Sequence, residues 1–168
     1  MIQVYTGNGK GKTTAALGLI IRALGSGKKV CLIQFMKKNN RLGEIRYLTR
    51  NKELDIFQFG TGKFIDPQNI SSADREAAAE GIKKTFELIS LKQYDLIILD
   101  EINIAVKWGL VKLADQLRLI EITGDTEIVM TGRYADERVM EKADLVTEMK
   151  EIKHYFSRGV KARKGIEF

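Results

Sequence analysis

Residues 2–14 read IQVYTGNGKGKTT, and this stretch decides the fold. The first four letters are a short apolar run with the β-branched and aromatic residues that are typical of a strand. The next nine letters contain three glycines and end on a lysine and two threonines. From Leu17 to Leu24 apolar side chains recur at helical spacing, and Gly25 and Gly27 end the pattern. The stretch therefore predicts a strand, a glycine-rich turn and a helix in direct succession.

The glycine-rich turn has the composition of a phosphate-binding P-loop. Glycines allow the backbone N–H groups to turn inward and phosphate oxygens to approach closely, and the following helix N-terminus adds a positive dipole. Lys12 brings a full charge, and the Thr13 hydroxyl can bind Mg²⁺. The strict pattern has glycine at the place of Thr6, but Gly7 stands beside it. The residues expected to bind phosphate are Gly7, Asn8, Gly9, Lys10, Gly11, Lys12, Thr13 and Thr14.

Five more apolar runs have the length of strands. They span residues 30–35, 54–59, 96–99, 127–130 and 145–148. Helical patterns between them cover residues 78–89, with a cap expected at Ser71 or Ser72, residues 113–120 and, more briefly, 135–142. Strands that alternate with helices predict an α/β fold with a mostly parallel central sheet and helices on both faces. Together with the phosphate loop, this pattern indicates a RecA-like P-loop NTPase fold.

The binding crevice of such a fold lies at the carboxyl ends of the strands. The phosphate loop belongs to this edge of the sheet, and so does the polar and basic segment 36–47. Periodicity assigns no structure to that segment, nor to the basic tail after Lys150. We therefore expect segment 36–47 to border the binding crevice.

The composition is that of a globular protein, with 168 residues of which 44% are apolar and 30% charged. We expect residues 1–168 to form a single P-loop nucleotide-binding domain with a basic C-terminal tail. No apolar run approaches the roughly 20 residues that cross a bilayer, no signal peptide precedes the first strand, and the single cysteine excludes an internal disulfide. These features favour the cytoplasm. The net charge of +6 suits a polyanionic partner, either ATP or a nucleic acid.

Two carboxylates, Asp100 and Glu101, directly follow the apolar run 96–99 and so lie at the carboxyl end of a predicted strand. In P-loop proteins an acidic residue at this place reaches the Mg²⁺ that the loop threonine holds. We expect Thr13 and Glu101 to approach one Mg²⁺, with Asp100 close behind. A second acid after an aspartate either binds the metal itself or polarises an attacking water.

Two further side chains are candidates for the same edge. Arg133 follows the run 127–130, where an arginine can clamp phosphate or stabilise a leaving group; a surface arginine in a turn fits the spacing equally well. His154, the only histidine, stands in the tail sequence KHYF at 153–156, and nothing local decides between a structural and a catalytic role.

Together these motifs resemble those of the P-loop ATP:corrinoid adenosyltransferases, the CobA/CobO/BtuR family. The resemblance covers nearly the whole chain. It rests on TGNGKGKTTAA at 6–16, Gly43-Glu44, Asp100-Glu101, Thr131-Gly132-Arg133, Ala143-Asp144, Lys153-His154-Tyr155-Phe156 and the closing Gly165-Ile166-Glu167-Phe168. It implies an enzyme that moves the 5′-deoxyadenosyl group of ATP to the Co(I) of a reduced corrinoid, in adenosylcobalamin synthesis or salvage, and that releases triphosphate.

The resemblance also implies roles for particular residues and partners. Lys12, Arg133 and Mg²⁺ would neutralise the triphosphate, Glu101 would bind the metal, and His154 would line the cleft. The implied partners are ATP, the reduced corrinoid, a second copy of the chain in a homodimer, and a reductase of flavodoxin or another type. Some members carry an N-terminal extension over the corrinoid, which we do not expect in a chain that opens on its first strand.

One segment departs from the family pattern. Members favour a corrinoid that has lost its lower axial ligand, and a Gly-Phe-Thr-Trp stretch supplies aromatic side chains for that task. The matching segment here is Gly62-Lys63-Phe64-Ile65, with lysine in place of the phenylalanine and isoleucine in place of the tryptophan. We expect Phe64, shifted by one position, to be the main aromatic contact beneath the corrinoid.

Two other functions fit parts of the sequence. The first is a P-loop ATPase whose attacking water is polarised by Glu101. The second is a RecA-like nucleic-acid-binding module, in which the basic tail would track phosphates through Arg158, Lys161, Arg163 and Lys164. The tail offers few aromatic side chains for base stacking, so nucleic acid is the less favoured partner.

Overall fold

A computed structural model describes residues 1–167; Phe168, the last residue of the closing segment named above, lies outside them. Six strands form one sheet in the order β3-β2-β4-β5-β1-β6, and all their pairings are parallel. The strands are β1 (Ile2–Thr6), β2 (Val30–Phe35), β3 (Leu54–Phe59), β4 (Leu96–Asp100), β5 (Glu127–Thr131) and β6 (Leu145–Glu148). The predicted α/β fold with a parallel central sheet is confirmed, and the arrangement is consistent with a RecA-like P-loop fold.

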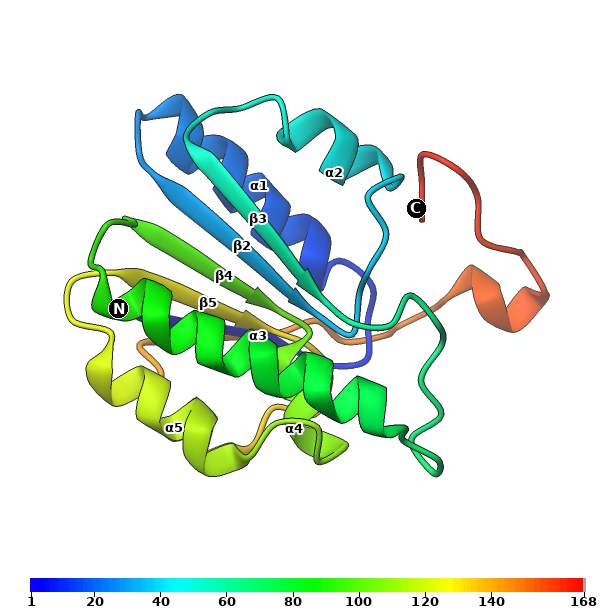
Figure 1. The fold of residues 1–168 in the computed structure, drawn as a ribbon. Helices are drawn as coiled ribbons and strands as arrows, with labels where there is room; N and C mark the ends of the chain where they lie inside the picture. Colours follow the sequence, from blue (N-terminus) through cyan, green and yellow to red (C-terminus); the bar gives the residue numbers. More distant parts are fainter. Residues whose placement is uncertain (168) are drawn as a thin grey trace.

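Helices cover both faces of the sheet (Figure 1). On one face lie α1 (Lys12–Gly25) and α2 (Gly43–Leu48). On the other lie α3 (Ser72–Ser90), α4 (Ile102–Lys107) and α5 (Leu113–Ile122), with α6 (Glu137–Lys142) against α5. The tail, which holds one 3₁₀ turn at Tyr155–Arg158, runs beyond the carboxyl ends of the strands and is drawn in orange and red.

The central strands are almost continuously apolar because their side chains alternate between two cores. In β2, Val30 and Leu32 belong to the core beneath α1 and α2, whereas Cys31 and Ile33 belong to the core beneath α3, α4 and α5. Strand β4 alternates in the same way. A strand covered on both faces needs apolar residues at nearly every position, which explains the apolar runs in the sequence.

The starts of α1 and α3 differ in a way that bears on binding. Ser71 caps α3, as predicted, and its hydroxyl accepts the N–H of Asp74 at 3.2 Å. Helix α1 follows Gly11, whose φ is 120°, and has no side-chain cap. Its first N–H groups therefore remain available for a bound anion.

Periodicity does not predict two of the short helices. Helix α2 lies partly within the unassigned segment 36–47, and α4 follows β4 after a single residue. Each has 6 residues, too few for a helical repeat to stand out from the neighbouring apolar runs. Within residues 1–167, no helix combines the length and the apolar character that crossing a bilayer requires.

Candidate active site

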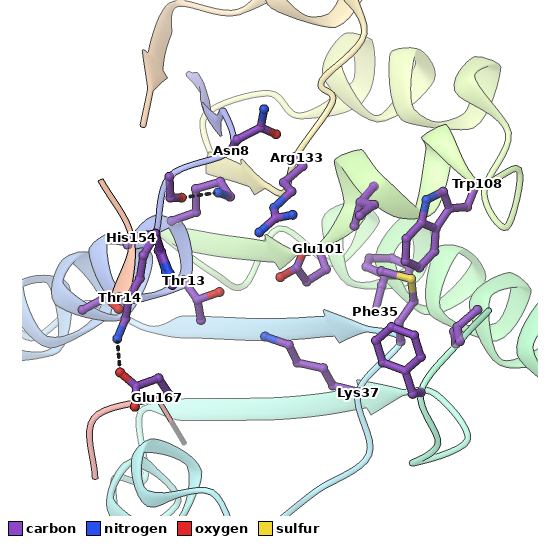
Figure 2. A pocket seen from close by; sticks show the side chains of 18 of the residues that line it. Asn8, Thr13, Thr14, Phe35, Lys37, Glu101, Trp108, Arg133, His154 and Glu167 are labelled. Atoms are coloured by element: carbon purple, nitrogen blue, oxygen red, sulfur yellow. Dashed lines mark hydrogen bonds and ion pairs between the residues drawn. The ribbon is translucent and has the colours of Figure 1, made fainter. Parts of the chain in front are cut away.

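A pocket of about 650 Å³ opens at the carboxyl edge of the sheet, beside the loop from β1 to α1. Most of the predicted site residues line it: Asn8, Gly9, Lys10, Gly11, Lys12, Thr13, Thr14, Phe64, Glu101, Arg133 and His154. Gly7 and Asp100 are not among its lining residues. Figure 2 shows Glu101 and Arg133 in the middle of the pocket, with Phe35 and Trp108 at one end.

Unusual backbone conformations gather at this edge. Met36, Glu101 and Tyr134 have φ values of 59°, 65° and 60°, and they follow β2, β4 and β5. Such conformations cost a non-glycine residue about 1–3 kcal/mol and concentrate at functional sites. Within residues 1–167 the one other case is Lys92, which follows α3 and lies outside the pocket.

Lys12 places its ammonium inside the phosphate loop. It donates to the carbonyls of Gly7 at 2.6 Å and Gly9 at 2.7 Å. Burial lowers the pKa of Lys12, the charge of Arg133 lowers it further, and Glu101 opposes both. Within residues 1–167 its hydrogen-bond partners are neutral carbonyls, so a bound anion would supply the missing counter-charge.

Gly7 and Gly9 also meet a packing requirement that the sequence does not indicate. A Cβ atom at Gly7 would lie 2.5 Å from the Met149 carbonyl oxygen, and a Cβ at Gly9 would lie 2.7 Å from it. The Gly9 N–H donates to that same oxygen at 2.6 Å. These two glycines thus let the segment after β6 pack against the loop.

Asp100 is fully buried at the end of β4, and its carboxylate accepts four hydrogen bonds. Oδ1 accepts from the hydroxyls of Thr13 (2.9 Å) and Thr131 (2.7 Å), and Oδ2 accepts from the amide of Gln34 (2.9 Å) and the ammonium of Lys37 (2.7 Å). Four donors fill the lone pairs of a carboxylate. Burial acts to raise the pKa of Asp100, but the charge of Lys37 and these hydrogen bonds outweigh it and lower the pKa.

The carboxylate of Glu101, the next residue, is not engaged in hydrogen bonds with residues 1–167. The side chain of Glu101 lines the pocket. Burial raises the pKa of Glu101, and the neighbouring Asp100 carboxylate raises it further. Three cations oppose this rise: Lys37, Lys12 and Arg133. The two adjacent carboxylates therefore differ: Asp100 holds protein groups in place by hydrogen bonds, whereas Glu101 faces the pocket.

Arg133 lies on the loop after β5, where the sequence places it. Its side chain is exposed and makes no hydrogen bond or ion pair within residues 1–167. The loop itself is fixed by the buried Asn103 of α4, whose amide donates to the carbonyls of Gly132 (3.3 Å) and Met130 (3.4 Å). Gly132 has a φ of 127°, and a Cβ there would approach the Ile104 nitrogen to 3.0 Å.

The basic tail folds back onto the phosphate loop and forms part of the pocket wall. The ammonium of Lys10 donates to the Tyr155 hydroxyl at 2.8 Å and to the Glu167 carboxylate at 3.0 Å. His154 lines the pocket, and its Nδ1 accepts the N–H of Phe156 at 3.1 Å. The side chain of Lys10 thus binds the tail, a contact that no pattern in the sequence indicates.

Phe64 and Ile65, in the segment that departs from the family pattern, both border the pocket but differ in exposure. Phe64 lies at the mouth with 94% of its surface exposed, whereas Ile65 is 6% exposed and belongs to the core. Trp108, at the end of α4, lines the pocket together with Phe35 (Figure 2). Trp108 is therefore a partly exposed aromatic side chain of the pocket, Phe35 is fully buried behind the pocket wall, and Phe64 stands at the rim.

Lys37 is the main functional candidate that sequence patterns do not single out. It lies in segment 36–47, which the topology places at this edge but periodicity leaves unresolved. Its one distinguishing feature in the sequence is its position two residues after a predicted strand. The ion pair with Asp100 joins residues that are 63 positions apart, so only the sheet brings them together.

Comparisons with known proteins show the family of this chain. The family model for "ATP:corrinoid adenosyltransferase BtuR/CobO/CobP" matches residues 1–168. The corrinoid adenosyltransferase of Sinorhizobium sp is 39% identical over 173 residues, which span 100% of this chain and 80% of the relative. Those of Pseudomonas aeruginosa and Escherichia coli strain K12 are 38% and 36% identical; each match spans 100% of this chain, with 83% and 85% of the relative. This chain belongs to the ATP:corrinoid adenosyltransferase family.

Proposed function

We propose that this pocket is where the chain transfers the 5′-deoxyadenosyl group of ATP to the Co(I) of a reduced corrinoid. As a member of the family, the chain is an enzyme that uses these two substrates. One observation carries the assignment to the pocket: the phosphate loop and an apolar wall of Ile104 and Trp108, backed by the buried Phe35, border the same space. The loop suits a triphosphate, and the wall suits a flat, largely apolar ring.

The reaction requires two things of the protein: alignment of the reacting carbon and neutralisation of the charge on the leaving triphosphate. A cobalt–carbon bond forms at the ribose 5′ carbon while the bond from that carbon to the triphosphate oxygen breaks. The electron pair of the broken bond leaves with the triphosphate, Co(I) becomes Co(III), and no proton moves. The protein must therefore align the carbon and neutralise the leaving group, and Lys12 and Arg133 are the cations proposed for that role.

Mg²⁺ is proposed to bind between Thr13 and Glu101. The donor set fits, because Mg²⁺ prefers oxygen ligands and Glu101 presents an open carboxylate to the pocket. Asp100, whose lone pairs are all used, acts by holding the Thr13 hydroxyl. When bound, Mg²⁺ supplies neutralisation of triphosphate charge and not a hydroxide. A nucleotide-bound structure with Mg²⁺ far from both Thr13 and Glu101 would refute this placement.

The deciding experiment is an anaerobic assay with ATP, Mg²⁺ and a chemically reduced corrinoid. We expect the absorption spectrum of the cobalt–carbon product to develop and inorganic triphosphate to appear only when Co(I) is present. Hydrolysis is the competing outcome, since an open carboxylate with a raised pKa is suited to act as a general base. Phosphate release without any corrinoid would therefore favour an ATPase that uses Glu101.

Replacing Arg133 tests its proposed contact with the triphosphate. We expect Arg133→Ala to lower kcat/KM by about 10- to 100-fold, as is typical for the loss of a hydrogen bond to a charged group. The melting temperature should not change, because the side chain is exposed and makes no bond within residues 1–167. The control is Arg138→Ala, which removes an arginine that pairs with Asp136 on α6. Equal kinetics for the two variants would count against the proposal, and His154→Ala can be assayed in the same way.

Phe64 remains the proposed aromatic contact beneath the corrinoid. We expect Phe64→Ala to slow transfer to complete cobalamin when a reductase generates Co(I), by roughly 10-fold. Transfer should change little when Co(I) is supplied chemically, since the lower ligand has then already dissociated. Stability should be unaffected because Phe64 is 94% exposed. Restoring tryptophan at 65 is a poorer test, since Ile65 is buried and a larger side chain would overfill the core.

The matched control for Phe64 is Tyr47→Ala, which removes an exposed aromatic side chain on α2 outside the pocket. Equal losses for Phe64→Ala in the two assays would show that the segment does not act in ligand displacement. No loss in either assay would make it a surface loop without a role in the reaction.

The organisation of the protein is also proposed. Residues 1–168 are taken to work as a single nucleotide-binding domain in the cytoplasm, and the contact of Lys10 with Glu167 supports a tail that belongs to the same unit. A homodimer, and a reductase of flavodoxin or another type that supplies electrons for Co(I), complete the proposal. Light scattering of the purified chain measures the oligomeric state. Tight, salt-dependent binding of oligonucleotides would contradict the expectation that nucleic acid is not a partner.

A further inference from the structure

Lys37 is a cation in the pocket to which the proposed reaction assigns no role. Its side chain is 27% exposed, and its ammonium donates one hydrogen bond, to Asp100 Oδ2 at 2.7 Å. An ammonium has three donors, and among residues 1–167 Asp100 is the single acceptor that they reach. Two N–H donors of Lys37 therefore have no acceptor among residues 1–167. The side chain lines the pocket (Figure 2).

The backbone around Lys37 is arranged to hold it at this place. Met36 adopts a φ of 59°, and its N–H donates to the Phe59 carbonyl at 2.7 Å. A Cβ atom at Gly60 would lie 2.6 Å from the Lys37 nitrogen, so the end of β3 presses directly on this turn. A strained conformation persists only when the surrounding structure enforces it, and functional sites are where such strain is usually found.

The simpler interpretation is that Lys37 only balances the buried charge of Asp100. Three of the four hydrogen bonds to Asp100 come from neutral groups. A residue that served only as the counter-ion of Asp100 would not need to reach the surface of the pocket. Lys37 instead borders the pocket, as do Lys12 and Arg133. The carboxylate of Glu101 lines this same pocket, so the three cations and Glu101 border one space.

We infer that Lys37 is a third cation of the triphosphate site, which contacts the leaving triphosphate directly while Asp100 holds its ammonium in position. The inference rests on the proposed function, because it assumes that triphosphate lies against the phosphate loop. Lys12 would reach the triphosphate from that loop, Arg133 from the end of β5 and Lys37 from the end of β2. Preorganised cations of this kind stabilise the charge that develops on a leaving group without costly rearrangement.

The test is the binding of inorganic tripolyphosphate to the full chain, measured by titration calorimetry in EDTA so that no metal takes part. We expect Lys37→Met to weaken binding by about 10- to 100-fold, the usual effect of losing a hydrogen bond between charged groups. The matched control is Lys38→Met, because Lys38 is the next residue, is exposed and lies outside this pocket. That variant should bind tripolyphosphate as the unchanged protein does.

A second comparison separates contact with triphosphate from support of Asp100. Lys37→Met leaves a buried carboxylate without its counter-charge, so the variant is expected to be less stable. Asp100→Asn and the double variant Asp100→Asn/Lys37→Met remove that complication, since neither contains the carboxylate. If Lys37 contacts triphosphate, the double variant binds it about 10- to 100-fold more weakly than Asp100→Asn does.

Two results would overturn the inference: equal affinities for Asp100→Asn and the double variant, or an unchanged affinity for a folded Lys37→Met. Neither result depends on adenosyl transfer. The transfer assay on the unchanged protein tests the proposed function separately, so failure of one can be told from failure of the other.

Discussion

Lys12→Ala is expected to lower kcat/KM for ATP by about 100- to 1000-fold or more, the range seen when one preorganised group that stabilises developing charge is lost. Lys12 is the cation inside the phosphate loop, and its hydrogen-bond partners within residues 1–167 are the neutral carbonyls of Gly7 and Gly9. Its charge is thus available to the triphosphate. The measurement is the anaerobic transfer assay with chemically generated Co(I), which isolates the use of ATP from reduction of the corrinoid.

The fold should survive this substitution. Lys12→Ala removes two hydrogen bonds at the wall of an open pocket, at a cost of about 1 kcal/mol each. The far-ultraviolet circular dichroism spectrum should be unchanged and the melting temperature slightly lower. The control is Lys28→Ala, because Lys28 is exposed, pairs with Asp95 and does not line the pocket. Turnover of Lys12→Ala at the level of this control would remove the basis for the phosphate-loop assignment.

Glu101→Gln is expected to impair catalysis and to stabilise the protein at the same time. The open carboxylate is the proposed Mg²⁺ ligand, so its loss should weaken the apparent affinity for Mg²⁺ in the transfer assay by at least about 10- to 100-fold. Burial and the neighbouring Asp100 raise the pKa of Glu101, which means that the folded state disfavours its charge. A neutral glutamine removes that penalty, so the melting temperature should rise at neutral pH.

The raised pKa of Glu101 also makes the free energy of unfolding depend on pH. The folded state holds a proton on Glu101 more readily than the unfolded state, where the pKa is near 4.5. The free energy of unfolding therefore falls as pH rises from about 4.5 to the raised folded pKa, and it levels off above that. Denaturant unfolding of Glu101→Gln should lack this decline. Parallel pH profiles for the variant and the unchanged protein would contradict the assigned environment of Glu101.

Asp100→Asn is the contrasting substitution, and it should destabilise. An asparagine cannot accept all four hydrogen bonds that the carboxylate accepts, and it leaves the ammonium of Lys37 without its partner. Breaking a buried ion pair from one side costs about 3–5 kcal/mol, and the partial exposure of Lys37 places the expected loss near 3 kcal/mol. The lowered pKa of Asp100 contributes stability that is present above pH 3.8 and lost as pH falls through the folded pKa. Opposite shifts in melting temperature for the two variants would show that these adjacent acids act differently.

Much of the fold could be predicted because its signals are local. Strands β2, β3 and β6 span the predicted residues, since apolar runs of strand length between polar turns have few alternative structures. The cap at Ser71 was also predictable from residue type. The helices α2 and α4 were not, because each is too short for its periodicity to be distinguished from neighbouring segments.

The sequence alone predicted a strand, a glycine-rich loop and a helix at one sheet edge as a phosphate site, and it placed two acids and an arginine near that loop. These conclusions depend on residues close together in the chain and on the rule that parallel strands end at a common edge. Only the tertiary structure decided how Asp100 and Glu101 differ, that Lys37 pairs with Asp100, and that Met149 packs on Gly7 and Gly9. The physical reason is that burial, hydrogen-bond saturation and charge pairing depend on neighbours in space, which the sheet brings together from distant positions in the sequence.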